Sequence, residues 1–345
     1  MRIPRLGRLT PGRAHPAGWA QDGWVSIIEP LRLGTFPTPL EPAPRLAQAL
    51  GLGADDLWIK RDDLTGLGGG GNKVRKLQYT AAVALAQGAT TLVTTGAAQS
   101  NHARLTAAAG AKLGLDVVLV LGGSGGAAAG NLALDGLLGA TIDWAGDFVA
   151  EALEVRAAQL TEELTGAGRV AVQIPYGGSS VDGARGYVDA GHEMLAQSPE
   201  LTRVVVAVGS GGTAAGLIDA LGPERVLGVD TGAVPDPLDR IATLLVGLGA
   251  RGAAAIDAFR LRTDQVGAGY SSLTEPVKDA LRLMARTEGV ILDPIYTGRA
   301  MAGLVAAVRD GDIGRGERTV LLHSGGLPGL FGSAEAMQWA GALGG

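Results

Sequence analysis

Short apolar runs alternate with longer segments of helical periodicity along most of the chain. Continuous apolar strands between helices are typical of parallel sheets that are covered on both faces. The pattern therefore predicts an α/β protein with doubly wound, mostly parallel sheets. The runs expected to be strands are residues 57–60, 91–95, 117–121, 140–144, 170–174, 204–208, 226–229, 290–292 and 319–322. The segments expected to be helices include residues 76–87, 100–113, 131–138 and 149–165.

Glycine is the most unusual feature of the composition. It accounts for 56 of the 345 residues, more than twice the average usage of about 7 %. The glycines follow no three-residue period, which excludes collagen. Several expected helices stop at a glycine, for example at Gly88 and Gly114, as helix C-termini often do. We therefore expect the excess glycine to close βα turns and to let the backbone approach a ligand.

Composition and charge exclude several classes of protein. Hydrophobic residues make up 46 % of the chain, too many for a disordered protein. The net charge of −5 and the pI near 5.5 argue against a nucleic-acid or anionic-membrane partner. No apolar run approaches the roughly 18 residues of a membrane helix. Absent cysteine excludes disulfides and thiolate chemistry, and the four histidines lack metal-ligand spacing, so we expect no metal site.

The first 25 residues carry four arginines but no apolar core of a secretory signal. They mix proline, glycine, arginine and tryptophan without periodicity. We interpret residues 1–25 as a loosely ordered extension, or as the result of a misplaced start codon, with no part in the chemistry. A cytoplasmic location is the expectation for a chain of this kind.

Residues 204–216 have the pattern of a strand, a tight glycine turn and a helix. Backbone N–H groups at such a helix start, together with the positive end of the helix dipole, favour a phosphate group. Ser210 and Thr213 can add hydroxyl donors. A simpler interpretation is that the glycines only tighten the turn.

The same loop leaves the identity of the phosphate open. Gly209, Gly211 and Ala214 fit the G-x-G-x-x-A fingerprint of dinucleotide-binding proteins, and Asp230 ends the following strand about 20 residues later. A nicotinamide-dependent oxidoreductase is therefore one hypothesis, and a protein that only binds a ligand is another.

A second glycine-rich loop, residues 66–71, leads to Asn72 and Lys73. Lysine is rare in this chain, with five residues against 24 arginines, and Lys73 and Lys76 both follow this loop. An amine placed where the backbone can approach a flat ligand suits a Schiff base to an aldehyde cofactor. The alternative, an ordinary basic helix start, is mildly unfavourable against the helix dipole, which favours the functional interpretation.

Further polar residues follow expected strands, where open α/β sheets bind their ligands. Ser100 and Asn101 open a helix and can hold a carboxylate, although an N-cap serine explains the spacing equally well. Tyr296 and Thr297 follow the expected strand at 290–292, and Tyr270 lies in a glycine-containing loop. Any one of these tyrosines is more often a packed core residue than a catalyst.

Five motifs together carry a resemblance to a known family. They are Lys60-Arg-Asp-Asp, Asn72-Lys-x-Arg-Lys-Leu, Gln99-Ser-Asn-His, Gly209-Ser-Gly-Gly-Thr and Asp293-Pro-Ile-Tyr-Thr-Gly. In this order and spacing the chain resembles, from about residue 31 to residue 331, the D-cysteine desulfhydrase and 1-aminocyclopropane-1-carboxylate deaminase family. That family belongs to the pyridoxal-phosphate enzymes of fold type II, which share the tryptophan synthase β-chain fold. The resemblance thus implies pyridoxal 5'-phosphate as the cofactor and two open, twisted sheets.

The resemblance also implies a role for each matching position. Lys73 matches the Schiff-base lysine, and Asn72 the contact to the phenolic oxygen of the cofactor. Ser100 and Asn101 match the pair that receives the substrate carboxylate, with His102 beside them. The implied phosphate-binding residues are Lys76, Ser210, Gly211, Gly212 and Thr213. Tyr270 and Tyr296 match tyrosines that flank the substrate, and Thr297 matches the partner of the pyridine nitrogen.

Position 297 separates the members of this family. It is glutamate in the cyclopropane deaminases and threonine in D-cysteine desulfhydrases, and His102 replaces a glutamine of the deaminases. A neutral partner suits β-elimination, so the implied activity is the conversion of D-cysteine to pyruvate, sulfide and ammonia. L-cysteate sulfo-lyase and 1-aminocyclopropane-1-carboxylate deaminase are the alternatives within this resemblance.

The resemblance finally implies an organisation for the chain. Residues 26–75 and 185–345 are expected to form a large cofactor-binding domain, and residues 76–184 a small domain inserted into it. The cofactor is expected in the cleft between them. The family resemblance also implies a homodimer that acts on a small amino-acid substrate.

Overall fold

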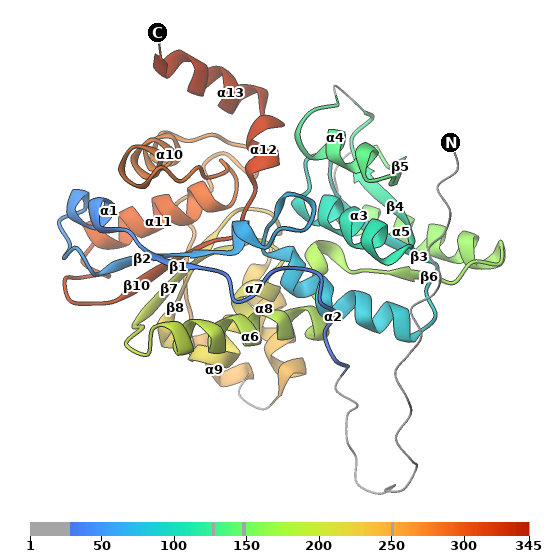
Figure 1. The fold of residues 1–345 in the computed structure, drawn as a ribbon, viewed down its shortest axis with the longest axis horizontal. Helices are drawn as coiled ribbons and strands as arrows, with labels where there is room; N and C mark the ends of the chain where they lie inside the picture. Colours follow the sequence, from blue (N-terminus) through green and yellow to red (C-terminus); the bar gives the residue numbers. More distant parts are fainter. Residues whose placement is uncertain (1–27, 126–127, 147–149, 250–251, 345) are drawn as a thin grey trace, which may run out of the picture.

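The structure is a computed structural model that describes residues 28–125, 128–146, 150–249 and 252–344. Its strands form two sheets that lie side by side, each with helices on both faces (Figure 1). The expected N-terminal extension, residues 1–25, lies outside the described residues. Among the described residues, no helix is both long and apolar enough to cross a membrane.

The larger sheet has six strands in the order β1-β2-β10-β7-β8-β9. All neighbours are parallel except β1, which pairs antiparallel with β2. The parallel arrangement confirms the α/β prediction and explains why most of these strands are apolar on both faces. The strands are β1 (Leu40–Pro42), β2 (Leu57–Arg61), β7 (Arg203–Val208), β8 (Val226–Asp230), β9 (Arg260–Arg262) and β10 (Thr319–His323).

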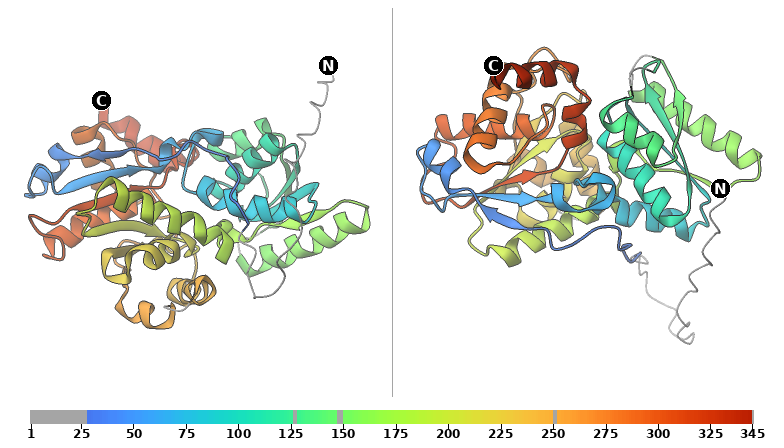
Figure 2. Two further views of the ribbon diagram at one scale, coloured as in Figure 1. Left: turned by 60° about the horizontal axis from the view of Figure 1, so that its bottom comes forward. Right: turned by 45° about the horizontal axis from the view of Figure 1, so that its top comes forward.

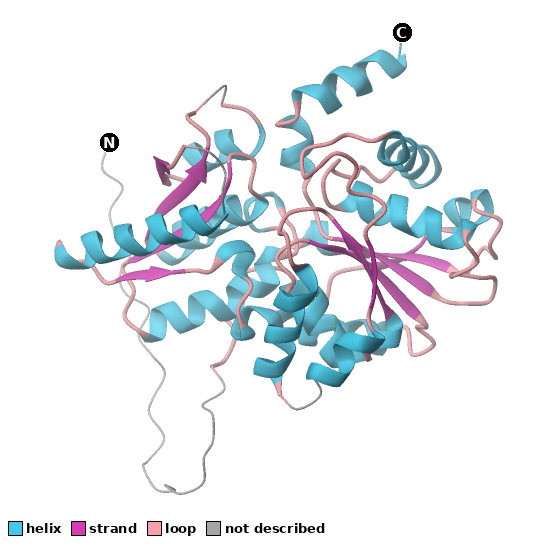
Figure 3. Ribbon diagram, turned by 180° about the vertical axis from the view of Figure 1, so that it is seen from behind, coloured by secondary structure: helices cyan, strands magenta, loops and turns pink. Residues whose placement is uncertain are grey.

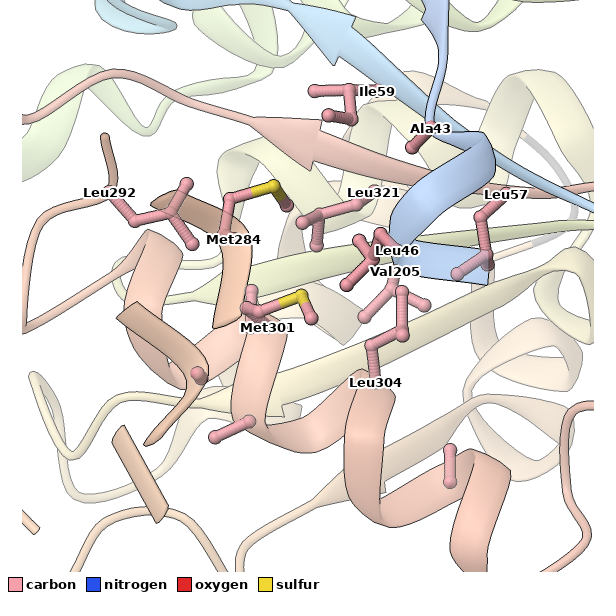
Figure 4. Packing of buried hydrophobic residues seen from close by; sticks show 14 of the residues in the cluster. Ala43, Leu46, Leu57, Ile59, Val205, Met284, Leu292, Met301, Leu304 and Leu321 are labelled. Atoms are coloured by element: carbon pink, nitrogen blue, oxygen red, sulfur yellow. The ribbon is translucent and has the colours of Figure 1, made fainter. Parts of the chain in front are cut away.

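Successive residues of the central strands pack against different helices. Val205 and Leu321 belong to one core cluster, with helices α1, α10 and α11 (Figure 4). Val204 and Leu322 belong to the opposite cluster, with α6, α7 and α8. The helices around this sheet are α1 (Pro44–Ala49), α6 (Val181–Gln197), α7 (Gly212–Leu221), α8 (Pro237–Leu248), α9 (Gly252–Ala258), α10 (Glu275–Glu288), α11 (Thr297–Arg309), α12 (Leu327–Phe331) and α13 (Ala334–Gly341).

The smaller sheet, cyan to green in Figure 2, has four parallel strands in the order β5-β4-β3-β6. Helices α2 and α3 pack on one face and α5 on the other. Its strands are β3 (Thr91–Ala97), β4 (Asp116–Gly122), β5 (Thr141–Trp144) and β6 (Ala171–Gln173), and its helices are α2 (Lys73–Ala86), α3 (Asn101–Leu113), α4 (Gly130–Leu137) and α5 (Ala150–Gly166). Figure 3 shows both layered sheets from behind.

The strands of the smaller sheet all come from residues 91–173, and those of the larger sheet from either side of them. The domain limits at residues 75 and 184 stay a prediction. Most expected strands and helices are present within a few residues, but helix α2 begins at Lys73 instead of residue 76. The sequence pattern gave no indication of the short edge strands β1 and β9.

The expected strand at residues 290–292 is wrong. Val290 and Leu292 are buried in the core beside α10, and Leu292 lies next to Met284 in Figure 4. The segment nevertheless forms no ladder with any described strand, because burial of its apolar side chains in the core does not by itself supply a neighbouring backbone to pair with. Tyr296 and Thr297 therefore follow a loop that starts helix α11, and not a strand of the sheet.

A charge-neutral ionic network fixes α2 in place. The guanidinium of Arg75 on α2 donates to both oxygens of Asp62 at 2.9 Å and to Glu193 on α6 at 2.9 and 3.0 Å. Lys60 on β2 donates to Glu193 at 2.5 Å. Burial alone would raise the pKa of Asp62, but the Arg75 guanidinium and the hydroxyl of Tyr187 hold it below its usual value. Each buried charge thus has its partner, as burial requires.

We predict that Asp62→Asn lowers the free energy of unfolding by about 3–5 kcal/mol, because it leaves the buried cations one anion short. Glu275→Gln is the matched control, since it breaks an exposed ion pair with Lys278 and is expected to cost about 0.5 kcal/mol or less. Denaturant unfolding of both variants measures the difference. Equal losses would contradict the assignment of the network as the brace of α2.

Candidate active site

A pocket lies where the carboxyl ends of strands from both sheets meet. Its lining comes from the segments that follow β3, β6, β7 and β10. The N-termini of α2, α3, α7 and α11 also contribute lining residues. Helix N-termini carry unpaired N–H groups and partial positive charge, so their convergence favours anionic ligand groups. The pocket lining includes most of the predicted site residues, namely Asn72, Lys73, Lys76, Ser100, Asn101, His102, Ser210, Gly211, Thr213, Tyr270 and Tyr296.

Lys73 is the first residue of α2 and presents its amine to the pocket. Removal from water lowers the pKa of Lys73 to about 8, because burial disfavours the charged form. The amine has no ion pair with a carboxylate of the described residues. An amine in this state is neutral in a sizeable fraction of molecules near neutral pH, which is what a nucleophilic lysine requires.

The glycine loop before Lys73 is shaped by close backbone approach. Gly70 has φ +75°, and a Cβ at this position would lie 1.9 Å from the carbonyl oxygen of Asp63, so only glycine fits. The buried side chain of Arg104 on α3 donates to the carbonyls of Gly68 at 2.6 Å and Gly70 at 3.1 Å. The loop that leads to Lys73 is therefore fixed by its close packing on the backbone of Asp63 and by the hydrogen bonds from Arg104.

A second amine defines an anion site beside the first. Lys76 is buried, and its Nζ donates to two neutral groups of the described residues, the carbonyl of Gly177 at 3.3 Å and the hydroxyl of Ser179 at 3.0 Å. Burial, and then the charge of Lys73, holds the pKa of Lys76 well below its usual value. The N-terminus of α7 lies next to it, since a Cβ on Gly212 would be 3.0 Å from this Nζ.

The groups around Lys76 fit a phosphate. Ser179 and Ser210 place their hydroxyls 2.7 Å apart, and Ser179 accepts from the N–H of Gly212 at 3.2 Å. No aspartate or glutamate is among the described residues that line the pocket. Two amines without a counter-ion, beside the start of a helix, form a site that a dianionic group would neutralise. A phosphorylated aldehyde therefore suits the pocket, with its phosphate near Lys76 and its aldehyde near Lys73.

The start of α3 offers donors for a second anion. Ser100 is the N-cap of α3 and accepts from the N–H of Ala103 at 3.1 Å, so the capping interpretation of this serine is confirmed. Its own hydroxyl proton stays available for a ligand. Asn101 accepts from Asn131 on α4 at 3.1 Å, which directs its amide N–H₂ elsewhere. A carboxylate at this position would meet one hydroxyl, one amide and the helix N-terminus.

His102 presents a fixed tautomer. Thr94 donates its single hydroxyl proton to the carbonyl of Ile174 at 2.8 Å, and the same oxygen lies 3.0 Å from Nε2 of His102. Nε2 must therefore carry the proton, which leaves Nδ1 as a buried acceptor without a partner among the described residues. Burial, together with Lys73 and Lys76, holds the pKa of His102 well below its usual value, so the ring is neutral.

Two tyrosines meet at the opposite side of the pocket. The hydroxyls of Tyr270 and Tyr296 are 2.7 Å apart, and their rings meet edge to face. Burial raises the pKa of both residues, so both remain protonated donors. A third tyrosine, Tyr176, also lines the pocket.

Thr297 and Gly212 are the predicted site residues that do not line the pocket. Thr297 is fully buried and follows Tyr296 in the chain as the first residue of α11. It donates its hydroxyl proton to the carboxylate of Asp293 at 2.6 Å and accepts from the Asp293 N–H at 2.8 Å. A hydroxyl with this arrangement has only a lone pair left to offer.

Sequence reasoning missed three residues of the site. They are Tyr176 and Ser179, which follow β6, and Asn131, which orients Asn101. The glycine-rich stretch after a parallel strand was the available signal for the first two. Asn131 gave no signal, because its role depends on the packing of α4 against α3.

Comparison with known proteins places the chain in a family. The family described as "Pyridoxal-phosphate dependent enzyme" matches residues 31–325. The chain belongs to this family. Its members use the phosphorylated aldehyde that the pocket fits, so the prediction of pyridoxal phosphate is confirmed and a nicotinamide cofactor is not supported. Asp230, the acidic residue of the dinucleotide fingerprint, accepts from the N–H of Gly232 at 2.9 Å.

Two relatives and one solved structure show where in the family the chain lies. A D-cysteine desulfhydrase of Klebsiella pneumoniae is 40 % identical over 87 % of this chain and 95 % of its own length. A Pyrococcus abyssi protein, provisionally named 1-aminocyclopropane-1-carboxylate deaminase, is 37 % identical over 92 % of this chain and 97 % of its own. The crystal structure of an ACC deaminase homologue superposes with a TM-score of 0.82 at 36 % identity, covering 90 % of this chain and 96 % of that one.

These comparisons confirm the fold-type II architecture and the assignment to the pyridoxal-phosphate enzymes of the deaminase and desulfhydrase group. The protein is thus a pyridoxal-phosphate dependent enzyme of the lyase and deaminase kind. The homodimer and the cytoplasmic location stay predictions.

Proposed function

We propose that this enzyme removes the β-substituent of a small amino acid, and that D-cysteine is its substrate. The products are pyruvate, sulfide and ammonia. The D-cysteine desulfhydrase of Klebsiella pneumoniae, at 40 % identity over most of both chains, supports this choice. The similar protein named for a cyclopropane deaminase keeps that activity as the main alternative.

One observation about the pocket carries the choice of substrate. Among the described residues that line it, the only lysines or arginines are Lys73 and Lys76. The cofactor accounts for both amines, one through its aldehyde and one through its phosphate. A substrate with a sulfonate, such as L-cysteate, would need a further cation for its second charge. A substrate whose only anion is its carboxylate, such as D-cysteine, needs none.

Pyridoxal phosphate, when bound, supplies an aldehyde that condenses with amines and a ring that delocalises the charge left at Cα. Lys73 is the residue that would hold it, with Asn72 beside its ring and Lys76, Ser210, Gly211, Gly212 and Thr213 around its phosphate. When its amine is free, Lys73 also takes the proton from Cα of the substrate. The pKa of about 8 makes this amine an effective base near neutral pH.

The substrate carboxylate is bound by Ser100 and Asn101 at the start of α3. Ser100 donates its hydroxyl proton, and Asn101 donates from the amide that Asn131 orients. His102 is neutral, so it brings no positive charge to the carboxylate, and its Nδ1 can act only as a hydrogen-bond acceptor. These contacts fix Cα near Lys73, and most of the rate gain from orientation depends on such positioning.

In this proposal Tyr270 and Tyr296 flank the departing β-substituent, because they line the same pocket as Lys73. Both keep their protons, since burial raises the pKa of each, and so either can donate a hydrogen bond to a departing thiolate. Thr297 donates its hydroxyl proton to the carboxylate of Asp293 and therefore has none to donate to the pyridine nitrogen. A threonine at this position gives a weaker electron sink than the glutamate of cyclopropane deaminases, which favours loss of a good leaving group over ring opening.

The substrate prediction is tested by steady-state assays of the holoenzyme with D-cysteine, L-cysteate, β-chloro-D-alanine and 1-aminocyclopropane-1-carboxylate. We expect pyruvate from D-cysteine and β-chloro-D-alanine, because thiolate and chloride leave without a further cation. Turnover of L-cysteate or of the cyclopropane substrate in preference to D-cysteine would contradict the proposal.

The carboxylate site is tested by Ser100→Ala against Ser333→Ala. Both serines cap a helix by accepting from the N–H three residues on, so each change is expected to lower the free energy of unfolding by about 1 kcal/mol. Only Ser100→Ala should also raise KM, about tenfold or more, because it removes a hydrogen bond to a charged group. Similar KM values for the two variants would place the carboxylate elsewhere.

A further inference from the structure

The loop between β9 and α10, residues 263–274, brings Tyr270 into the pocket. Nearly all of the loop is half-buried or exposed, and the hydroxyl of Tyr270 lies 2.7 Å from that of Tyr296. A tyrosine on a loop at the surface needs a restraint if it is to meet a substrate in a fixed position. The contact between the two hydroxyls is a single hydrogen bond, worth only about 1 kcal/mol.

A buried cation supplies a much stronger restraint. Arg299 on α11 is fully buried and donates to the carbonyls of Gly269 at 2.8 Å, Tyr270 at 2.9 Å and Ser272 at 3.0 Å. These three carbonyls share the two N–H groups of one terminal nitrogen, and the other terminal nitrogen donates to the carbonyl of Thr231, which follows β8. No ion pair joins it to a carboxylate of the described residues, so carbonyl dipoles are its direct hydrogen-bond partners. If the loop moved away, the buried guanidinium would lose most of its acceptors, at a cost of several kcal/mol.

The position of Arg299 on its helix matters as much as its contacts. Tyr296 lies three residues earlier, and residues at this spacing are neighbours on a helix surface. The beginning of α11 thus contacts the loop at two points: the hydroxyl of Tyr296 hydrogen-bonds to the hydroxyl of Tyr270, and the guanidinium of Arg299 donates to the backbone around Tyr270. The two contacts together fix both the place and the direction of the Tyr270 ring.

We propose that Arg299 is a positioning residue, which holds Tyr270 against Tyr296 by tying loop 263–274 to α11 and to the end of β8. Its effect on the reaction rests on the proposed function, since Tyr270 is assigned there to the leaving group. Arg299 touches neither substrate nor cofactor in this account. Its contribution to turnover passes entirely through Tyr270.

Arg104 provides a matched control within the same chain. Like Arg299, it is fully buried, and it also donates to carbonyls of a glycine loop, those of Gly68 and Gly70. That loop leads to Lys73 and not to Tyr270. A change at Arg104 therefore removes equivalent buried hydrogen bonds from an arginine to loop carbonyls, without affecting the loop that carries Tyr270.

The first test is a double-mutant cycle on the holoenzyme with Arg299→Lys and Tyr270→Phe. Lysine keeps the charge but cannot reach four carbonyls at once. We expect each single change to lower kcat/KM by about 10-fold to 100-fold and the double variant to be no worse than the more damaging single one. Arg104→Lys combined with Tyr270→Phe should instead give multiplied losses. Multiplied losses for the Arg299 pair would overturn the proposal.

The second test does not depend on activity. Limited digestion of the holo-protein with chymotrypsin is followed at Tyr270 and, for global unfolding, at the core residue Tyr187. Arg299→Lys is expected to speed cleavage at Tyr270 at least tenfold with cleavage at Tyr187 unchanged, whereas Arg104→Lys leaves the Tyr270 site protected. A parallel increase at both tyrosines would show general destabilisation and overturn the proposal.

Arg299→Gln, which keeps two N–H donors without a charge, replaces Arg299→Lys if the latter does not fold. Failure of both variants to fold would assign Arg299 a structural role alone and also overturn the proposal. If the wild-type protein turns over none of the amino acids tested, the proposed function fails, and the digestion still decides whether Arg299 restrains the loop.

Discussion

The site depends on the buried pairing of Arg75 with Asp62 and Glu193. This pairing fixes the first turn of α2 to α6 and to the turn that follows β2, and Lys73 and Lys76 project from that same turn of α2 towards the pocket. The charges of the network cancel once Lys60 is included. The carboxylates of Asp62 and Glu193 are therefore fully paired within the network, and the amines of Lys73 and Lys76 are left to a ligand.

The pocket has the opposite character to the network. Its two amines face neutral groups and the starts of helices, and burial lowers the pKa of both. Such a site stores an unfavourable electrostatic arrangement that an anion relieves. The same feature that makes the protein bind a phosphorylated cofactor thus also keeps Lys73 reactive. Arg104 on α3 and Arg299 on α11 each donate to the carbonyls of a glycine-containing loop, so helices fix the positions of the loops that bring Lys73 and Tyr270 to the pocket.

Much of this could be predicted from the sequence, because the chemistry follows local motifs. Asn72, Lys73, Ser100 and Ser210 follow glycine turns or expected strands, and the carboxyl ends of strands from both sheets bring them to one pocket. The strand prediction at residues 290–292 was wrong because it rested on the apolar pattern alone, and an apolar run also needs a neighbouring backbone to become a strand. Asn131 and Arg299 could not be predicted, because their roles depend on contacts between segments 27 or more residues apart.

The most direct test of the account is to load the protein with pyridoxal phosphate, reduce it with borohydride and map the modified peptide. We predict a coloured holo-protein that loses its visible absorbance on reduction, with the adduct on Lys73, and a Lys73→Ala variant that stays folded but carries no adduct. A folded wild-type protein that remains colourless with the cofactor, or an adduct on Lys76 or any other lysine, would contradict the account.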